Sequence, residues 1–229
     1  MNENGCKMTE IVTTAQMRAL EAAAMESGRV TGYALMQRAG AAVIAAVLEA
    51  WPDMAQGPHC ALVMCGPGNN GGDGYVIADG LCRFGWTVGL CATRPPAPGD
   101  AARAAAAWEE GGGQTQSMDT LGATLAMLCD RAGPAPVLVV DALLGIGQTR
   151  NTDAILAPFR NAVATLSGPH CALRHVAVDV PTGYDSDTGE ALAAQPFPAD
   201  LVVTFHARKP VHGVLDRQGI RSVVVPIGL

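Results

Sequence analysis

The sequence has little charge and no cluster of basic residues. Only 16% of its 229 residues are charged, and its 15 Lys and Arg residues are dispersed along a chain whose formal net charge is −6. Proteins that bind nucleic acids present grouped basic side chains to the phosphates. We therefore expect no nucleic-acid partner, and an anionic ligand would have to be held locally by backbone amides.

Long apolar runs are also absent. The longest one, residues 39–48, is shorter than the roughly 20 residues that a membrane-spanning helix needs. Residues 1–10 lack the basic segment followed by an apolar segment that marks a secretory signal peptide. We therefore expect no membrane partner and a cytoplasmic location.

The sequence contains no C-x-x-C pair. Its cysteines are odd in number and lie mostly within apolar stretches, whereas zinc sites and disulfide frameworks use paired cysteines. We therefore expect reduced thiols in the protein core and a reducing compartment. The seven residues concerned are Cys6, Cys60, Cys65, Cys82, Cys91, Cys129 and Cys171.

Two catalytic signatures are missing as well. No Gly-Lys-Ser/Thr follows a glycine loop, which excludes a P-loop, and no nucleophile elbow accompanies a Ser/His/Asp order. The histidines are scattered, and we interpret them as structural, with His206 of interest because it lies between Phe205 and Lys209. They are His59, His170, His175, His206 and His212.

Apolar stretches that alternate with helical patterns are present throughout the chain. A capping box formed by Thr13 and Gln16 begins the first helical pattern. The patterns predict strands at 60–64, 86–91, 115–117, 137–140, 175–178, 201–205 and 222–225, and helices at 14–28, 33–51, 75–84, 101–110, 119–131 and 152–166. This alternation predicts an α/β fold with a mostly parallel sheet covered on both faces, formed by residues 1–229 as one domain.

A glycine-rich stretch follows the first predicted strand. Residues 65–74 read Cys-Gly-Pro-Gly-Asn-Asn-Gly-Gly-Asp-Gly. Glycine permits positive φ and close approach of a ligand, and the N-terminus of the following helix favours anions. Asn69, Asn70 and Asp73 add side-chain oxygens, so we interpret the stretch as a ligand site. It also satisfies G-x-G-x-x-G, but residues 86–94 offer no acidic residue for a ribose, so the dinucleotide fingerprint alone is weak evidence.

Two further predicted strands end in aspartate. Asp141 precedes a Gly-Ile-Gly loop, and Asp179 precedes Pro-Thr-Gly. Because the carboxyl ends of parallel strands share one edge, we expect these loops to converge with residues 66–73. For either aspartate alone, a role as a helix cap or loop anchor is an equally good interpretation.

Four motifs in order resemble one known family. They are residues 66–74, 140–145 (Val-Asp-Ala-Leu-Leu-Gly), 178–183 (Val-Asp-Val-Pro-Thr-Gly) and 204–210 (Thr-Phe-His-Ala-Arg-Lys-Pro). Together with residues 14–21 and 38–40, they are similar to the NAD(P)H-hydrate epimerases, the YjeF N-terminal domain family. The resemblance implies a three-layer α-β-α Rossmann-like sandwich, a homodimer, and interconversion of the R and S forms of hydrated NADH and NADPH. Some relatives continue into a dehydratase; none is expected within residues 1–229, and the resemblance suggests coupling to a separate dehydratase.

The resemblance also assigns site residues. It implies catalytic roles for Asp179 and Lys209. It implies a potassium ion held by Asn70, Asp141 and Thr182, where Thr replaces the usual Ser and keeps the hydroxyl. It implies that the substrate contacts Asp179 and the segments Asn69, Asn70, Gly71, Gly72, Asp73 and Gly145, Ile146, Gly147, Gln148, Thr149, Arg150, Asn151.

The assigned residues make chemical sense. A hydrated nicotinamide carries a hydroxyl on C6, and Asp179 could donate a proton to it as it departs and take the proton back from re-adding water. Lys209 could fix the charge of Asp179, bind a phosphate or carboxamide, or be a solvated charge. Oxygen ligands suit a hard cation; the residues alone also allow sodium, magnesium, or no ion with Asp141 capping its loop.

Two other functions stay open at this point. One is a non-catalytic module of the same fold that binds a nucleotide or a protein, although such a module need not keep Asp179, Asn70 and Lys209. The other is a nicotinamide-dependent dehydrogenase, which would bind ordinary NAD(P) and transfer hydride.

Overall fold

A single parallel sheet organises the computed structural model, which describes residues 10–166 and 171–229. The seven strands have the order β3-β2-β1-β4-β5-β6-β7, and every neighbouring pair is parallel. The chain runs outward from β1 on one side and from β4 on the other, so the order reverses between these two strands. The strands are β1 (Cys60–Cys65), β2 (Thr87–Ala92), β3 (Thr115–Ser117), β4 (Val137–Ala142), β5 (Leu173–Val178), β6 (Leu201–Phe205) and β7 (Arg221–Val225).

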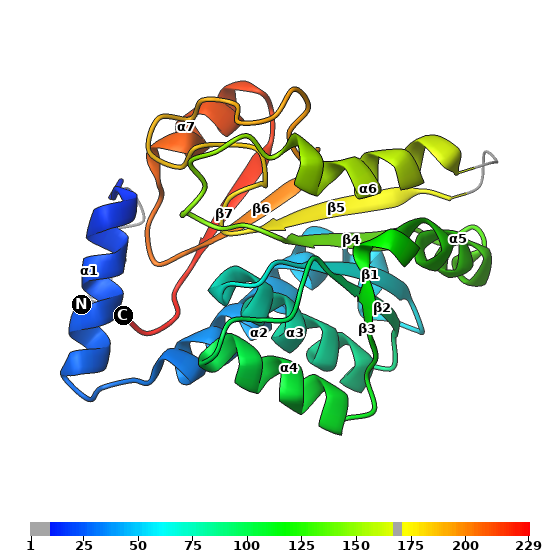
Figure 1. The fold of residues 1–229 in the computed structure, drawn as a ribbon, viewed down its shortest axis with the longest axis horizontal. Coiled ribbons are helices and arrows are strands. Elements are labelled where there is room, and N and C mark those ends of the chain that lie inside the picture. Colours follow the sequence, from blue (N-terminus) through cyan, green and yellow to red (C-terminus); the bar gives the residue numbers. More distant parts are fainter. Residues whose placement is uncertain (1–9, 167–170) are drawn as a thin grey trace.

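Helices cover both faces of this sheet. In Figure 1, α2, α3 and α4 lie below the sheet and α6 and α7 lie above it, with α5 beside α6. The predicted α/β fold with a parallel sheet between helical layers is thus confirmed. The helices are α1 (Thr14–Glu26), α2 (Gly32–Ala50), α3 (Asn69–Arg83), α4 (Asp100–Glu110), α5 (Leu121–Ala132), α6 (Asp153–Thr165) and α7 (Pro210–Arg217), with short 3-10 turns η1 (Pro52–Ala55) and η2 (Met118–Thr120).

Two apolar cores follow from the alternation of side chains along the strands. On β1, Ala61, Val63 and Cys65 point into the core shared with α2, α3 and α4. Cys60, Leu62 and Met64 point into the core shared with α5 and α6. Because successive strand residues face opposite sides, a strand buried on both faces must be apolar throughout, as β1 is.

Most predicted elements agree with the structure to within two residues. The capping box is present: Gln16 N donates to Thr13 Oγ1 at 3.3 Å and Thr13 N donates to Gln16 Oε1 at 2.8 Å. Helix α7 was not predicted, because its apolar pattern is only two turns long.

The glycine-rich stretch differs from the prediction. Helix α3 begins at Asn69 and not near residue 75, so Gly71, Gly72 and Gly74 are helical. No glycine between residues 66 and 74 has a positive φ. A Cβ on Gly71 would overlap the carbonyl oxygen of Gly66, and one on Gly74 would lie 2.7 Å from both Cys65 Sγ and Ala142 Cβ. These glycines therefore let the start of α3 pack closely against the ends of β1 and β4.

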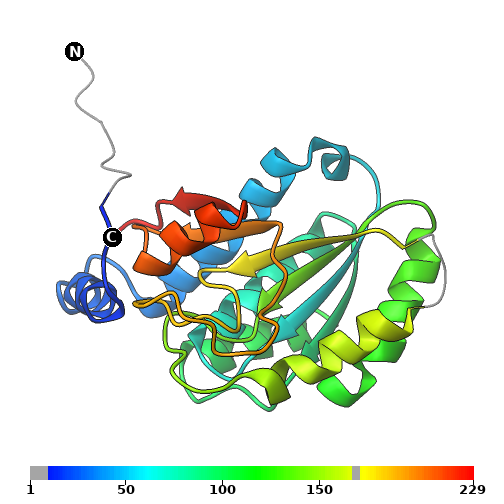
Figure 2. The same ribbon diagram turned by 90° about the horizontal axis from the view of Figure 1, so that it is seen from above.

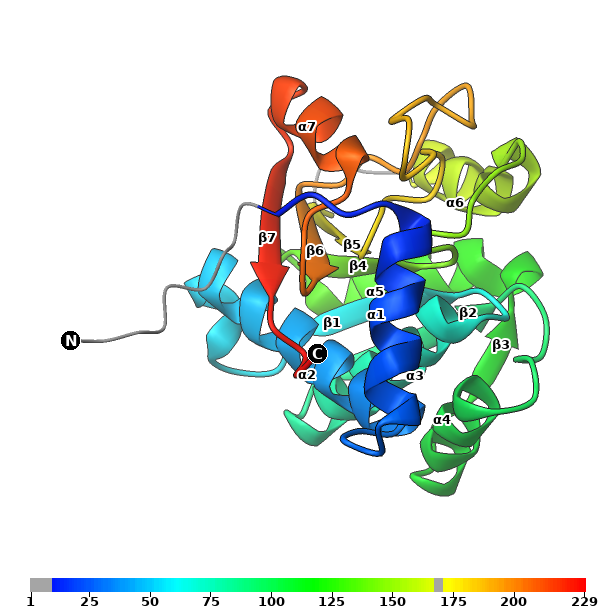
Figure 3. The ribbon, with the colours of Figure 1, turned by 90° about the vertical axis from the view of Figure 1, so that its left-hand side faces the viewer.

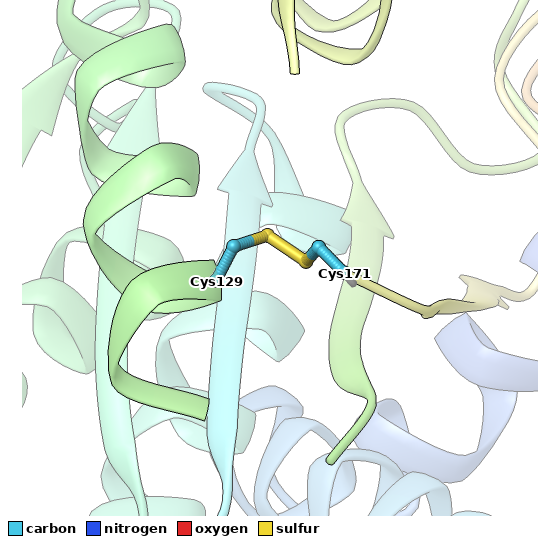
Figure 4. Close-up of a disulfide and its surroundings, with 2 residues drawn as sticks. All are labelled: Cys129 and Cys171. Atoms are coloured by element: carbon cyan, nitrogen blue, oxygen red, sulfur yellow. A yellow bond between two sulfur atoms is a disulfide. The ribbon is translucent and has the colours of Figure 1, made fainter. Parts of the chain in front are cut away.

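The expectation of reduced cysteines is wrong for one pair. Cys129 and Cys171 form a disulfide with a Cα–Cα distance of 5.4 Å (Figure 4). It joins the end of α5 to the segment that leads into β5. The sequence separation of 42 hides this proximity; it arises because β5 pairs with β4, the strand that follows α5. Cys60, Cys65 and Cys91 are buried free thiols, Cys82 is exposed, and Cys6 lies outside the described residues.

Helix α2 is long and apolar enough to cross a membrane by length and composition, and 44% of its most apolar window is buried. Core helices of soluble proteins pass the same test. Here the buried face of α2, including Val43, Ile44 and Val47, packs against α3 and the sheet. Its apolar character is thus explained by the core.

Helix α1 stands outside both helical layers. Figure 2 shows it apart from the body of the sheet, and Figure 3, which looks onto the edge beside it, shows it lying across that edge. Val12 N donates to Arg208 O at 2.8 Å, and the Thr14 hydroxyl donates to Ile146 O at 3.1 Å and lies 2.5 Å from the Ser186 hydroxyl. These contacts fix α1 over the loops that follow β4, β5 and β6.

Candidate functional site

A cavity of about 640 Å³ lies at the carboxyl edge of the sheet, beneath α1. It is bounded by the loops after β1 and β4, the strands between which the sheet order reverses. Open parallel sheets bind ligands at such a point. The predicted site residues that line the cavity are Asn69, Asn70, Asp73, Gly145, Ile146, Gly147 and Asp179.

The other predicted substrate contacts lie elsewhere in this structure. Gly71 and Gly72 are buried where α3 packs, and Thr149 and Arg150 are exposed outside the cavity lining. Buried Gln148 joins two loops, because its Oε1 accepts from Gly183 N at 2.7 Å and its Nε2 donates to Pro181 O at 3.2 Å. Asn151 Oδ1 accepts from Asp153 N at 3.0 Å, at the start of α6.

Asp179 and Lys209 form a buried ion pair. Lys209 is 1% exposed, and its Nζ donates to Asp179 Oδ1 at 2.7 Å, to Thr204 Oγ1 at 2.8 Å and to Phe205 O at 3.2 Å. The Thr204 hydroxyl also donates to Asp179 Oδ1 at 2.8 Å. Lys209 is therefore no solvated charge; it fixes the charge of Asp179.

Asp179 is held in the ionised form. Burial acts to raise the pKa of its carboxyl, but the charge of Lys209 and the hydrogen bonds from Lys209 and Thr204 outweigh it and lower the pKa below the ordinary value. Oδ1 accepts both bonds, and Oδ2 has no hydrogen-bond donor among the described residues. Asp179 lines the cavity, and its carboxylate keeps one oxygen without a hydrogen bond from the described residues.

The backbone of Asp179 is strained. Its φ is +66°, a left-handed value that is uncommon for a residue other than glycine. Its N–H donates to Val203 O at 2.8 Å, and its carbonyl lies 3.2 Å from His212 Nε2. His212 Nδ1 accepts from Lys209 N at 2.9 Å, so Nε2 carries the proton and donates to Asp179 O. Burial lowers the pKa of His212 to about 4, which keeps the ring neutral.

Asp141 and Thr182 bind each other outside the cavity lining. Thr182 donates to Asp141 from its N–H and from its hydroxyl, each at 2.7 Å, and Leu143 N donates at 3.2 Å. Asp141 is fully buried, and burial raises the pKa of its carboxyl to about 6 against the hydrogen bonds from Thr182. The pair ties the loop after β4 to the loop after β5.

Asn70 supplies the third predicted metal ligand. It lines the cavity, and its Oδ1 lies 3.1 Å from the position that a Cβ on Gly145 would occupy. Its Nδ2 is buried without a partner among the described residues. A buried amide that lacks a partner indicates a missing ligand or water. The amide oxygen of Asn70 and the oxygens of Asp141 and Thr182 are of the type that a hard cation takes as ligands, whereas the unpartnered Nδ2 is a hydrogen-bond donor that requires an acceptor.

The sequence did not point to the contribution of α1. Arg18 and Glu21 line the cavity, and Arg18 is the one basic residue among the described lining residues. The acidic lining residues are Glu21, Asp73, Asp100 and Asp179. The capping box located the helix, but its position over the cavity depends on long-range contacts of Val12 and Thr14 that no local pattern encodes.

Known proteins are similar to this chain in sequence. Residues 32–211 match the family described as YjeF-related protein N-terminus. The NAD(P)H-hydrate epimerase of Cereibacter sphaeroides is 45% identical over 228 residues, which cover 93% of this chain and 99% of that protein. The NAD(P)H-hydrate epimerase of Rhodobacter capsulatus is 42% identical over 231 residues, covering 97% and 100%.

More distant matches agree. The bifunctional NAD(P)H-hydrate repair enzyme Nnr of Escherichia coli is 36% identical over 183 residues, covering 79% of this chain and 32% of that protein. The crystal structure of the yeast protein ynu0 superposes with a TM-score of 0.74 at 21% identity, covering 95% and 88% of the two chains, and so shows the same fold. The resemblance seen in the four sequence motifs is confirmed, and the chain belongs to the YjeF-related N-terminal family.

Proposed function

We propose that this protein is an NAD(P)H-hydrate epimerase that interconverts the R and S forms of hydrated NADH and NADPH in nicotinamide nucleotide repair. The observation that carries the proposal is the ionised Asp179, paired with buried Lys209 and lining a cavity at the point where the strand order reverses. The names of relatives that match the chain nearly end to end support it.

The chemistry requires the C6–O bond to break and form again. The hydroxyl leaves as water while the lone pair of the ring nitrogen forms a C6=N bond, and water then adds to the opposite face. Asp179 has an unbonded oxygen and a lowered pKa, which suits a group that accepts the proton of the adding water. Lys209 and Thr204 hold that carboxylate in place. The lowered pKa makes donation by the same group unfavourable, in contrast to the single-residue scheme expected from the sequence.

The substrate is a nucleotide, and we propose that it contacts the parts of segments 69–73 and 145–151 that line the cavity, which are Asn69, Asn70, Asp73, Gly145, Ile146 and Gly147. The N–H groups at the start of α3 attract a phosphate, and Arg18 adds a positive charge beside Gly147, where its Nη2 lies 2.9 Å from the position of a Cβ on that glycine.

We also propose that Asn70, Asp141 and Thr182 hold a potassium ion. Bound there, the ion would supply positive charge next to the loops that receive the anionic substrate. We expect KCl to raise the midpoint temperature of thermal unfolding more than NaCl does. The variant Asn70→Ala should remove this difference between the two salts. Equal midpoints in both salts would contradict a potassium-selective site.

Two further features rest on the family. We propose a homodimer in the cytoplasm, and size-exclusion chromatography with light scattering should give twice the mass of the chain. We also propose that a dehydratase acts after this enzyme, because relatives such as that of Escherichia coli are named bifunctional repair enzymes.

The variant Asp179→Asn tests the function. It should lower kcat for epimerisation by about 10²–10⁴-fold, the usual contribution of a general acid or base, while binding of the hydrated nucleotide changes little. Asp130→Asn, an exposed position on α5, is the matched control and should leave kcat unchanged. A module that only binds a nucleotide would show the same binding in all three proteins and no turnover above the spontaneous rate.

A further inference from the structure

The proposed reaction needs a proton donor as well as an acceptor. Asp179 is ionised and cannot donate. The ammonium of Lys209 has three N–H groups, and it makes three hydrogen bonds, to Asp179, Thr204 and Phe205. Neither partner of the ion pair therefore has a proton free for the departing hydroxyl.

Asp73 is a second carboxyl at the same cavity. It comes from the second turn of α3, lines the cavity and is 9% exposed. Its side chain has no hydrogen-bond or ion-pair partner among the described residues. An ionised carboxylate in such a place would be costly, so the protonated form is favoured. Burial raises the pKa of Asp73 well above its ordinary value, and the charges of Asp179 and Glu21 raise it further.

Glu21 of α1 also lines the cavity, close enough for its charge to act on Asp73. Burial raises the pKa of Glu21, with a contribution from the charge of Asp179, while Lys209 and Arg18 act to lower it. Among the described residues, Asp100 of α4 also lines the cavity, and the buried thiol of Cys65 on β1 interacts with the charge of Asp73. Acidic groups thus outnumber cations around Asp73.

We propose that Asp73 donates the proton to the departing C6 hydroxyl and that Glu21 is a positioning residue on α1 that keeps Asp73 protonated. The inference rests on the epimerase function proposed above. It assigns opposite protonation states to two carboxyl groups at one cavity, a pattern that separates an acid from a base.

Two proton transfers accompany the breaking and forming of the C6–O bond. The Asp73 proton moves to the hydroxyl oxygen, the C6–O bond breaks with its electron pair going to oxygen, and the nitrogen lone pair forms the C6=N bond. Water then adds to C6 on the other face, the C6=N pair returns to nitrogen, and the Asp179 carboxylate takes the proton of that water. Asp73 ends ionised and Asp179 protonated, and exchange with solvent or turnover of the opposite epimer restores the starting state.

The activity test uses three variants and one control variant over a range of pH. Asp73→Asn should lower kcat by about 10²–10⁴-fold with KM nearly unchanged. Glu21→Gln removes a negative charge next to Asp73, so Asp73 should lose its proton at lower pH and the alkaline limb of the kcat profile should shift to lower pH. Glu21→Asp should restore part of this shift. Glu26→Gln, an exposed position on the same helix, should leave the profile unchanged.

A second measurement does not depend on turnover. In the protein labelled with carbon-13 at aspartate carboxyls and free of nucleotide, Asp73 should titrate above the ordinary aspartate range, and at lower pH in Glu21→Gln. Titration in the ordinary range would overturn the inference even if the wild type epimerises its substrate. An Asp73→Asn variant in which KM changes and kcat does not would also overturn the inference. A wild type with no turnover above the spontaneous rate overturns the proposed function, and this donor with it.

Discussion

Buried Lys209 is paired with Asp179 and lowers the pKa of that carboxyl. Its three N–H groups all donate within the protein, and the carboxylate that receives one of them keeps its second oxygen free. A charge this deeply buried is tolerated only because its partner and acceptors are complete. Removal of the lysine would leave Asp179 as a buried charge without a countercharge.

The variant Lys209→Met should therefore lower the free energy of unfolding by about 3–5 kcal/mol, measured by urea denaturation at pH 7. The double variant with Asp179→Asn should lose less than the sum of the single losses, because it leaves no unpaired charge. Arg208→Met, which removes the neighbouring and more exposed pair with Asp216, should cost less than about 1 kcal/mol. A Lys209→Met protein as stable as Arg208→Met would contradict the ion-pair account.

His212 gives the fold a specific pH dependence. Its pKa is about 4 in the folded protein against an ordinary value of 6.5. Between these values the unfolded chain binds a proton that the folded chain does not, so stability is lost as pH falls through this window, by about 3 kcal/mol at pH 4. The variant His212→Asn has no titrating ring at this position and therefore lacks this loss of stability.

The difference in unfolding free energy between wild type and His212→Asn should accordingly narrow from pH 7 to pH 4. Comparison of the two proteins removes the effect of Asp141, whose raised pKa of about 6 acts in the opposite direction over the same window. A difference that stays constant with pH would show that His212 does not titrate as described.

At the scale of elements, the start of α3 shows how packing overrides local preference. Glycine disfavours helix by up to about 1 kcal/mol relative to alanine, so a run of glycines predicts a loop. Tertiary contact decides otherwise, because only glycine allows α3 to approach Gly66, Cys65 and Ala142. The strands and most helix bounds were predictable from the sequence because they depend on local apolar patterns.

Two glycine-to-alanine changes in helices should have opposite effects. Gly71→Ala should destabilise the protein by more than about 1 kcal/mol, since the new Cβ overlaps the Gly66 carbonyl. Gly122→Ala in α5 meets only an ordinary contact, 3.9 Å from Ala162 Cβ, and should stabilise it by up to about 1 kcal/mol. Thermal or urea unfolding measures the stability of both variants against the wild type. Stabilisation by Gly71→Ala would refute the close packing of α3.

The disulfide joins two elements whose contact the sequence hides. The double variant Cys129→Ala/Cys171→Ala should lower the free energy of unfolding by about 2–4 kcal/mol without reductant. Dithiothreitol reduces the disulfide, so in its presence the wild type should have a free energy of unfolding similar to that of the double variant. Cys82→Ser, at an exposed free thiol, serves as the control and should change little. A wild type insensitive to dithiothreitol and equal to the double variant would exclude the bond.

At the scale of the whole molecule, parallel topology made part of the site predictable. The parallel strands whose carboxyl ends bring Gly66, Asp141 and Asp179 into place had to share one edge, and the loops after all three strands border the cavity or support it. The strained backbone of Asp179, the mutual binding of Asp141 and Thr182, and the lining by Arg18 and Glu21 could not be predicted. Each depends on contacts between residues far apart in the chain.

The most direct test of the central claim is the conversion of purified R-form hydrated NADH to the S form by the wild-type protein, followed by coupling to a dehydratase specific for the S form. The account predicts that the R form is consumed faster than its spontaneous epimerisation, in proportion to enzyme concentration. A rate equal to the spontaneous one, with folded protein that binds the nucleotide, would contradict it.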